Sequence, residues 1–299
     1  MKLPFRTTFT GALAVLVALA VASPRAGLAA GDAAQTAAAP RRIISLVPAL
    51  TQMLFAIGAG PKVIAVSTFD NEPAAVKALP KVGALLDPDV ERILSLKPDL
   101  VALYGTQDDL RTQLERAGIA HYDYRHAGLA GVTGTLRELG ARTGLAAEAN
   151  RAAADIEQRL AALKARTAGR PKVRTLLVFG REPNSLRNVY ASGGRGFLHD
   201  LLEVAGGVNV FADIAAESVQ PSSEQILARA PEAILEIRAV GLGLNGGPLE
   251  TASWNALASV PAVRQQRIFT LAGSHYVVPG PRVAETAEGI ARALHPELF

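Results

Sequence analysis

The segment from 145 to 168, LAAEANRAAADIEQRLAALKARTA, most constrains the fold of this 299-residue chain. It consists largely of strong helix formers, it follows Gly144, and Gly169 and Pro171 come directly after it, so we expect one unbroken helix. Its larger apolar residues recur at steps of three and four, which leaves most of its surface polar. At 1.5 Å per residue it would be about 36 Å long. Such a helix predicts a bridge between two lobes, with a peripheral helix of one α/β domain as the alternative.

Two similar segments flank this helix. Residues 91–101, ERILSLKPDLV, and residues 224–234, EQILARAPEAI, carry Glu, Ile, Leu and Pro at the same offsets, 133 positions apart (224 − 91). Each predicts a short helix with Glu91 or Glu224 in its first turn, then a proline that ends the helix, then a buried strand. We interpret the match as an internal repeat of one helix-strand unit, with one copy on each side of the bridge. The alternative is coincidence, because so short a combination of residues arises easily by chance.

Strand and helix patterns alternate on both sides of the bridge. This predicts an α/β fold of two Rossmann-like lobes with parallel sheets, covering 41–144 and 169–299, and a ligand cleft between them. The predicted strands are 42–47, 63–66, 100–103, 119–124, 173–179, 208–211, 233–237 and 267–271. The predicted helices outside the bridge are 48–57, 73–79, 89–96, 108–117, 132–142, 197–204, 224–230, 254–259 and 283–294. We expect a loop over 180–194 and an irregular Gly-rich run over 241–247.

The first 29 residues have the pattern of a secretory signal peptide. Lys2 and Arg6 precede the apolar run 9–22, and small residues occupy 27–29. The apolar run is too short to span a bilayer comfortably, and residues 30–40 have the composition of a flexible leader. Because the chain has no cysteine, it offers no lipid-attachment residue and no disulfide. We therefore expect a soluble monomer in the periplasm after cleavage.

Cleavage would also change the charge balance. The first 29 residues hold three basic residues and no acid, so 28 of the 31 Lys and Arg residues remain (31 − 3) against 27 Asp and Glu. The formal charge of +1 (28 − 27) gives no support for nucleic-acid binding. The chain also lacks the G-x-S-x-G, Walker and H-E-x-x-H motifs. These absences favour a binding protein over an enzyme.

Two local clusters allow a metal or phosphate site. His121, Asp123 and His126 follow one another in HYDYRH, and imidazole and carboxylate suit several divalent ions. Strand alternation sends neighbouring side chains to opposite faces, so we favour a polar strand end and expect no bound metal ion. The Gly-rich stretch 193–196 precedes a predicted helix, but no Lys-Ser/Thr follows it, which favours a turn over a phosphate loop.

The ordered motifs RRIISLVPALTQ, FDNEP, LPKVG, DPDVERILSLKPDLV, LLVFG, LLEVAGGVNVF, SSEQILARAPEAIL and GPRV resemble those of the periplasmic binding proteins of ABC importers for cobalamin, haem and iron-siderophores. In that family a helical backbone joins the lobes. The resemblance covers nearly the whole chain after residue 40, and the cobalamin-binding members are nearest in register. It implies no permanent cofactor, a transported cobalamin or ferric chelate as ligand, and the membrane subunits of an importer as partner.

The resemblance also implies where the ligand binds. Phe69, Tyr104 and Tyr276 stand where cobalamin binders place cleft residues, and His275 beside Tyr276 is counted with them. Leu85 and Ser218 stand at positions where those proteins have tryptophan, and Ser274 stands where they have an acidic residue. A ligand other than cobalamin therefore stays open. The tyrosine ligand that haem binders carry near LPKVG is missing here, which weakens the haem alternative.

Three arginines add a charged set of candidates. Arg181, Arg187 and Arg195 lie in or just after the loop that leaves predicted strand 173–179. Guanidinium groups pair well with the carboxylates or catecholates of ferric siderophores. The alternative for each is a solvated loop residue. A ferric siderophore therefore stays open as the ligand beside cobalamin.

In the resembling family, glutamates at the positions of Glu91 and Glu224 dock onto arginines of the importer's membrane subunits. A first-turn acid is also stabilised by the helix N-terminus, by about 0.3 to 1 kcal/mol, without any partner. Two further classes of function stay open from the residues alone. One is a secreted hydrolase or lyase that uses His275 or His199 with a neighbouring acid, and the other is a binder of a bare metal ion such as zinc.

Overall fold

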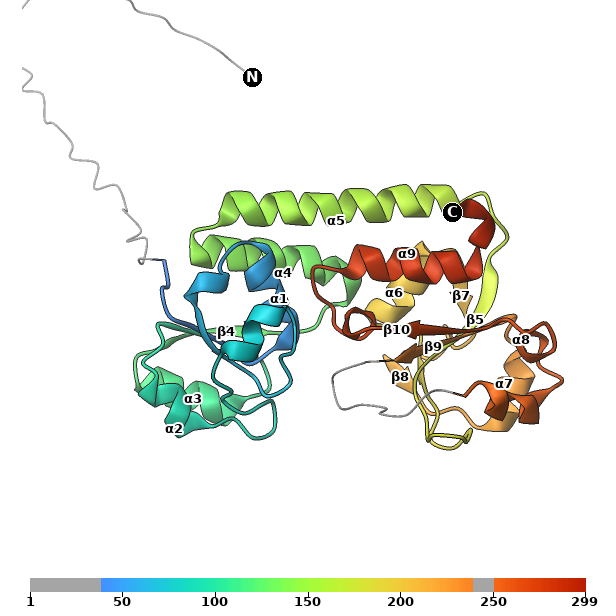
Figure 1. Cartoon of the computed structure of the whole chain (residues 1–299), viewed down its shortest axis with the longest axis horizontal. Coiled ribbons are helices and arrows are strands. Elements are labelled where there is room, and N and C mark those ends of the chain that lie inside the picture. Colours follow the sequence, from blue (N-terminus) through green and yellow to red (C-terminus); the bar gives the residue numbers. More distant parts are fainter. Residues whose placement is uncertain (1–38, 239–249) are drawn as a thin grey trace, which may run out of the picture. The chain divides into compact units, whose positions relative to one another are not determined.

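Two β-sheets form the frame of the protein, and the computed structural model describes it at residues 39–238 and 250–299 (Figure 1). By their contacts, residues 39–299 form one unit. The predicted signal peptide, the predicted leader up to residue 38 and the predicted run 241–247 lie outside the described residues. None of the described helices is long and apolar enough to cross a membrane.

Sheet A is parallel throughout, with strand order β2, β1, β3, β4. Its strands are β1 (Ile43–Ser45), β2 (Val63–Val66), β3 (Leu100–Tyr104) and β4 (Ala120–Tyr124). The elements between them are α1 (Pro48–Ala56), η1 (Gly60–Lys62), η2 (Ala74–Ala78), α2 (Val90–Ser95) and α3 (Asp108–Arg116). Because the connection after β1 leads to β2 and the one after β3 leads to β4 on the other side, a crevice opens at the carboxyl ends of these two central strands. We call sheet A with α1, α2 and α3 the first lobe.

Sheet B has the order β10, β9, β5, β6, β8, with β7 paired to β5. Its strands are β5 (Val173–Gly180), β6 (Tyr190–Ser192), β7 (Gly207–Asn209), β8 (Ser218–Val219), β9 (Ala233–Arg238) and β10 (Ile268–Ala272). Its helical elements are α6 (Phe197–Val204), α7 (Ser223–Arg229), η3 (Ala252–Leu257), α8 (Pro261–Arg264), η4 (Ser274–Tyr276), α9 (Val283–Leu294) and η5 (Pro296–Leu298). We call sheet B and these helices the second lobe.

The second lobe does not have the purely parallel sheet that the sequence predicts. Strand β6 pairs antiparallel with both β5 and β8, and β6 lies inside the segment 180–194 that the sequence predicts as a loop. Strands of three and two residues are too short to show an alternating pattern, so nothing in the sequence marks them. Two short predicted helices, 73–79 and 254–259, form the 3-10 turns η2 and η3 instead.

Successive strand residues enter different cores, as the period of two requires. In sheet A, Ile43 faces the core under the long helices, whereas Ile44 faces the core under α2 and α3. In sheet B, Leu177 joins the same long-helix core, and Leu176 packs on the opposite face. Buried side chains from both lobes therefore share one apolar core beneath the helices.

The long helix runs where the sequence predicts it, as α5 (Ala146–Thr167) against a predicted 145–168. It packs along α4 (Gly128–Thr143) and also contacts α9 (Figure 1). A Cβ at Gly140 of α4 would collide with Ala149 of α5, so this glycine sets the close approach of the two helices. Helix α4 begins four residues before its predicted start, because the glycines of its first two turns hide the helical pattern.

The repeated segments have the same local structure. Asp89 caps α2 and Ser222 caps α7, each accepting a hydrogen bond from the backbone N–H three residues on, and the caps lie 133 positions apart (222 − 89). Lys97 and Ala230 end the two segments with positive φ angles of 47° and 45° at the same offset (230 − 97). Left-handed backbone at two non-glycine residues is uncommon, so the match extends beyond the shared residue types.

Candidate ligand-binding site

A cavity of about 590 Å³ is built from both lobes. From the first lobe and the segment that follows it, the lining residues are 46–49, Ser67, Phe69, Ala84, Leu85, Tyr104, Tyr124 and His126. From the second lobe they are Phe179, 195–198, Glu217, Ser218 and 277–279. A volume of this size lies in the usual range for small-molecule sites.

The strand ends explain why these residues meet. Tyr104 is the last residue of β3, Tyr124 is the last residue of β4, and Ser67 follows β2 directly. Because the strands of sheet A are parallel, their carboxyl ends lie at one edge of the sheet, which is where such folds receive ligands. The second lobe contributes the start of α6 and the segment after η4.

Aromatic and aliphatic side chains dominate the wall. The rings of Tyr104 and Tyr124 meet edge to face with centroids 6.2 Å apart. Burial raises the pKa of Tyr124 to about 12, with smaller effects from Tyr104 and Glu217, and burial followed by Asp70 raises the pKa of Tyr104. Both phenols therefore stay protonated at neutral pH. Phe69 is 53% exposed at the cavity and offers a free aromatic face.

The lining carries few charges, and they balance. Among the described residues of the lining, Arg195 and Glu217, both exposed, are the only arginine or lysine and the only carboxylate. Ser67 lies in the wall with its hydroxyl donating to the Asp70 carboxylate at 2.6 Å. Asp70 is buried, and that burial raises its pKa despite the hydrogen bonds from Ser67. The site is therefore largely apolar and close to neutral.

Four of the predicted ligand-binding residues line the cavity: Phe69, Leu85, Tyr104 and Arg195. Tyr276 and His275 do not. Tyr276 belongs to the buried core and points at Gly289 of α9, where any Cβ would collide with its hydroxyl. The His275 ring lies against the Tyr276 ring at 4.3 Å. The chain reaches the cavity only at the next three residues, 277–279.

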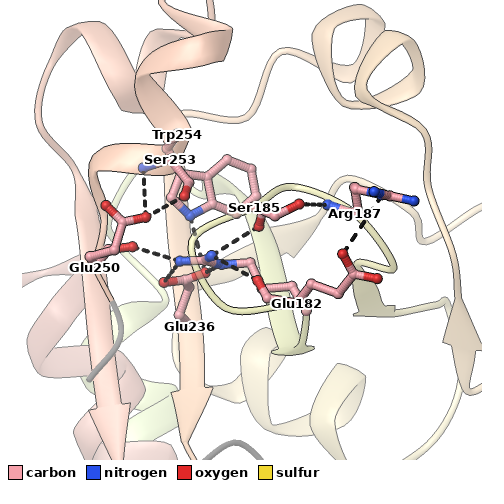
Figure 2. Close-up of polar contacts among 8 residues, drawn as sticks. Glu182, Ser185, Arg187, Glu236, Glu250, Ser253 and Trp254 are labelled. Atoms are coloured by element: carbon pink, nitrogen blue, oxygen red, sulfur yellow. Dashed lines mark hydrogen bonds and ion pairs between the residues drawn. The ribbon is translucent and has the colours of Figure 1, made fainter. Parts of the chain in front are cut away.

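Arg181 does not line the cavity and is instead buried in the second lobe. Its side chain is 1% exposed and its Nε lies 2.5 Å from Oε1 of Glu236, which is 2% exposed. Figure 2 shows Glu236 beside Trp254 in this cluster of polar contacts. The Nη atoms of Arg181 donate to the backbone carbonyls of Ser185 and Glu250 at 2.9 and 2.7 Å, and the Trp254 indole N–H donates to the same Glu236 oxygen at 3.1 Å. Every one of these groups comes from the second lobe, so Arg181 fastens its loops and does not line the cavity.

Arg187 also stays outside the cavity. Its side chain is 82% exposed, and its Nε lies 3.7 Å from the Glu182 carboxylate. Figure 2 marks this ion pair with a dashed line. Arg187 is therefore a solvent-exposed loop residue, which is the alternative that the sequence left open for each of the three arginines. The ligand-binding roles predicted for Arg181, Arg187, His275 and Tyr276 are therefore not carried into the proposal below.

The remaining candidates lie elsewhere. Glu91 and Glu224 are exposed in the first turns of α2 and α7. His121 and Asp123 lie 3.8 Å apart beside Arg111, and His199 pairs with Glu203 at 3.7 Å on α6. Within the described residues no group of three or more His, Cys, Asp or Glu side chains could hold a metal ion.

Several lining residues are not predicted from the sequence. Phe197 and the apolar run 277–279 carry no motif, and Phe179 lies in the motif LLVFG without being predicted as a ligand contact, so only the fold brings them beside Tyr124 and His126. The one available signal is position, since Tyr124 and His126 end or follow a predicted strand of a parallel sheet.

Comparison with known proteins now defines the class. A family model described as periplasmic binding protein matches residues 43–274, and the chain belongs to this family. It is similar to the vitamin B12-binding protein of Salmonella typhimurium, with 32% identity over 260 residues that cover 86% of this chain and 91% of the relative. These proteins bind ligands and are not enzymes, so the hydrolase alternative is set aside.

Solved structures agree with the two-lobed fold. The periplasmic vitamin B12 binding protein BtuF of Vibrio cholerae matches with a TM-score of 0.71 and 26% identity, covering 85% of this chain and 96% of that one. A periplasmic haem binding protein from Pseudomonas aeruginosa matches with a TM-score of 0.73 and 26% identity, covering 86% and 93%. The fold is therefore shared by binders of different tetrapyrroles.

Proposed function

We propose that this chain is the periplasmic substrate-binding component of an ABC importer and that its ligand is a corrinoid of the cobalamin type. The observation that carries the proposal is the cavity itself, which is rich in aromatic side chains and about 590 Å³ in volume, and whose described lining holds one arginine, Arg195, and one carboxylate, Glu217. A corrinoid offers a broad apolar ring with peripheral amides and little net charge. The similarity to vitamin B12-binding proteins supports the same ligand class.

The cavity gives less support to the alternatives. A ferric tris-catecholate carries several negative charges and would need a group of cations, but two of the three predicted arginines lie outside the cavity. The tyrosine ligand that haem binders of this family carry near LPKVG is missing here, because Ala84 and Leu85 stand at that place. Haem remains the second candidate because a haem binding protein shares the fold at 26% identity.

The test is a titration of the purified protein with cyanocobalamin, haemin and a ferric tris-catecholate, followed by calorimetry. We expect cyanocobalamin to bind with a one-to-one stoichiometry and with an affinity that changes little with salt, because few charges face the cavity. Tighter binding of haemin, or a catecholate affinity that falls steeply with salt, would overturn the corrinoid assignment.

We also propose that α2 and α7 dock onto the importer. Glu91 and Glu224 occupy the same offset in the two repeated units, and both are exposed. A hydrogen bond from Ser222 lowers the pKa of Glu224, so its carboxylate stays ionised. Figure 1 shows α2 and α7 at the edge of the described unit that lies away from α5. Two matched anionic sites suit a partner with two equivalent cationic surfaces.

A further inference from the structure

His126 is the one imidazole among the described residues that line the cavity, and its ring has neighbours on two sides. It follows β4 by two residues, and its Nδ1 lies 3.3 Å from the hydroxyl of Tyr124, the last residue of that strand. Phe197, the first residue of α6 in the second lobe, meets the ring edge to face, with centroids 5.5 Å apart at 89°. The imidazole is thus held by both halves of the cavity.

These contacts leave one ring nitrogen available. Within residues 39–238 and 250–299, no protein group hydrogen-bonds or ion-pairs with Nε2 of His126. When Nδ1 carries the proton and donates to the Tyr124 hydroxyl, Nε2 presents a lone pair. Metal-binding histidines have this arrangement as a rule, because the second nitrogen is fixed by a hydrogen bond that sets the tautomer and the ring orientation.

We propose that Nε2 of His126 coordinates the metal of the bound chelate at an exchangeable axial position. The inference rests on the proposed function and narrows it to metal tetrapyrroles that carry a replaceable axial ligand. With a cobalt(III) corrinoid that holds axial water, the bond from cobalt to water oxygen breaks, the bond from cobalt to Nε2 forms, and the water leaves. Cobalt stays in the +3 state and the Nδ1 proton stays on the ring, so no oxidant or reductant is needed.

This role has a consequence for specificity. A corrinoid with both axial positions blocked must bind through ring contacts alone, whereas one with an axial water gains a coordinate bond. Cobinamides provide the matched pair, because diaquacobinamide has water on both faces and dicyanocobinamide has tightly held cyanide on both. The outcome therefore does not depend on which face of the corrin turns toward His126.

The experiment records the visible spectrum and the calorimetric affinity of the full chain with each cobinamide. We expect a one-to-one shift of the corrin bands with diaquacobinamide and none with dicyanocobinamide. His126→Ala should remove the shift and weaken diaquacobinamide binding by about tenfold or more beyond the loss that the same variant shows with dicyanocobinamide. Tyr124→Phe, which keeps the imidazole and loses its partner, should keep the shift and lower the affinity for diaquacobinamide.

If His126→Ala fails to fold, the wild-type spectrum still tests whether a protein group coordinates cobalt, and His126→Gln, which keeps a polar side chain at this position, tests whether that group is the imidazole. Binding of both cobinamides without a band shift would overturn the coordination by His126 and leave the proposed corrinoid function standing. A shift that persists in folded His126→Ala would also overturn it, since another group would then be the ligand. Failure of cyanocobalamin and both cobinamides to bind would overturn the proposed function and this inference together.

Discussion

The guanidinium of Arg282, at the start of α9, lies 3.3 Å from the carboxylate of Glu72, 210 positions earlier in the chain. Glu72 belongs to the segment that follows β2 and carries Phe69 to the cavity, so the pair joins the first lobe to the second beside the candidate site. Arg282 also contacts Glu285 at 2.9 Å within its own helix. The relationship matters because few other ion pairs among the described residues join the two lobes.

The strength of this pair is open to a double-mutant cycle with Glu72→Gln and Arg282→Gln. Both side chains are 40% exposed, so water and salt screen the attraction. We expect a coupling free energy of unfolding below about 1 kcal/mol that shrinks as salt is added. The measurement is urea denaturation of the four proteins at two salt concentrations. A larger, salt-independent coupling would show that the pair is desolvated in solution.

His275, close to this pair, should make stability depend on pH. Burial lowers its pKa, and Arg282 lowers it further, while Glu285 and Glu72 act in the opposite direction. The unfolded chain therefore binds this proton more readily than the folded protein does. Above the ordinary histidine pKa of about 6.5, His275 is neutral in both states and the folded protein keeps its full free energy of unfolding. That free energy decreases as pH falls through the lower pKa of the folded state, because the unfolded chain then binds the proton more tightly.

His275→Gln removes this proton site. The free energy of unfolding of the variant should fall less than that of the wild type between pH 6.5 and pH 5, in denaturant titrations at matched ionic strength. Parallel pH curves for the two proteins would contradict the prediction.

The buried pair of Arg181 and Glu236 should be essential for stability. Arg181→Met leaves the Glu236 carboxylate buried without its partner, which should cost about 3 to 5 kcal/mol of unfolding free energy. The exposed Arg187 is the control, and Arg187→Met should stay within about 0.5 kcal/mol of the wild type. Adding Glu236→Leu to Arg181→Met should recover part of the loss. Equal stability of the two arginine variants would refute the assignment of Arg181 to the core.

The aromatic contacts can be tested with Phe69→Ala and Tyr104→Ala. Each ring should contribute on the order of 1 kcal/mol beyond the area it buries against a flat ligand, or roughly fivefold in affinity. Calorimetric titration with cyanocobalamin gives the affinities. Phe299→Ala is a suitable control, because this residue is similarly exposed but packs between Arg166 and Arg292 outside the cavity. Unchanged cyanocobalamin affinity in the double variant would exclude both residues from the site.

The sequence is sufficient to predict the elements with long, repeated patterns. Helix α9 has its predicted bounds of 283 and 294, and α5 differs from its prediction by one residue at each end. In both, apolar residues recur over three or more turns, and Gly or Pro marks an end. By contrast, β6 and β8 are held in place only by their partners, since their few residues have no periodic pattern of their own.

The site is harder to predict because equivalent residue types have different fates. Arg181 and Arg195 both follow β5 in the chain, yet only Arg195 lines the cavity. Arg181 is held away from the cavity by its ion pair with Glu236. Glu236 lies 55 positions later in the chain, and the pairing of β5 with β9 brings it beside Arg181. A carboxylate that distant is invisible to local patterns. Strand ends are more informative, as Tyr104 shows, because the topology alone places them at the ligand edge.

The docking proposal leads to the last prediction. Replacing Glu91 and Glu224 with alanine removes one exposed anion from each repeated unit, so binding to the importer's membrane subunits should weaken at least about tenfold, and more at low salt. Cyanocobalamin affinity should not change, because neither residue lines the cavity. The matched control is Glu148→Ala with Glu203→Ala, which removes the same charge from α5 and α6. Binding to detergent-purified importer is measured by surface plasmon resonance for all three proteins. Equal importer binding by the two double variants would show that net charge, and not these two positions, controls the encounter.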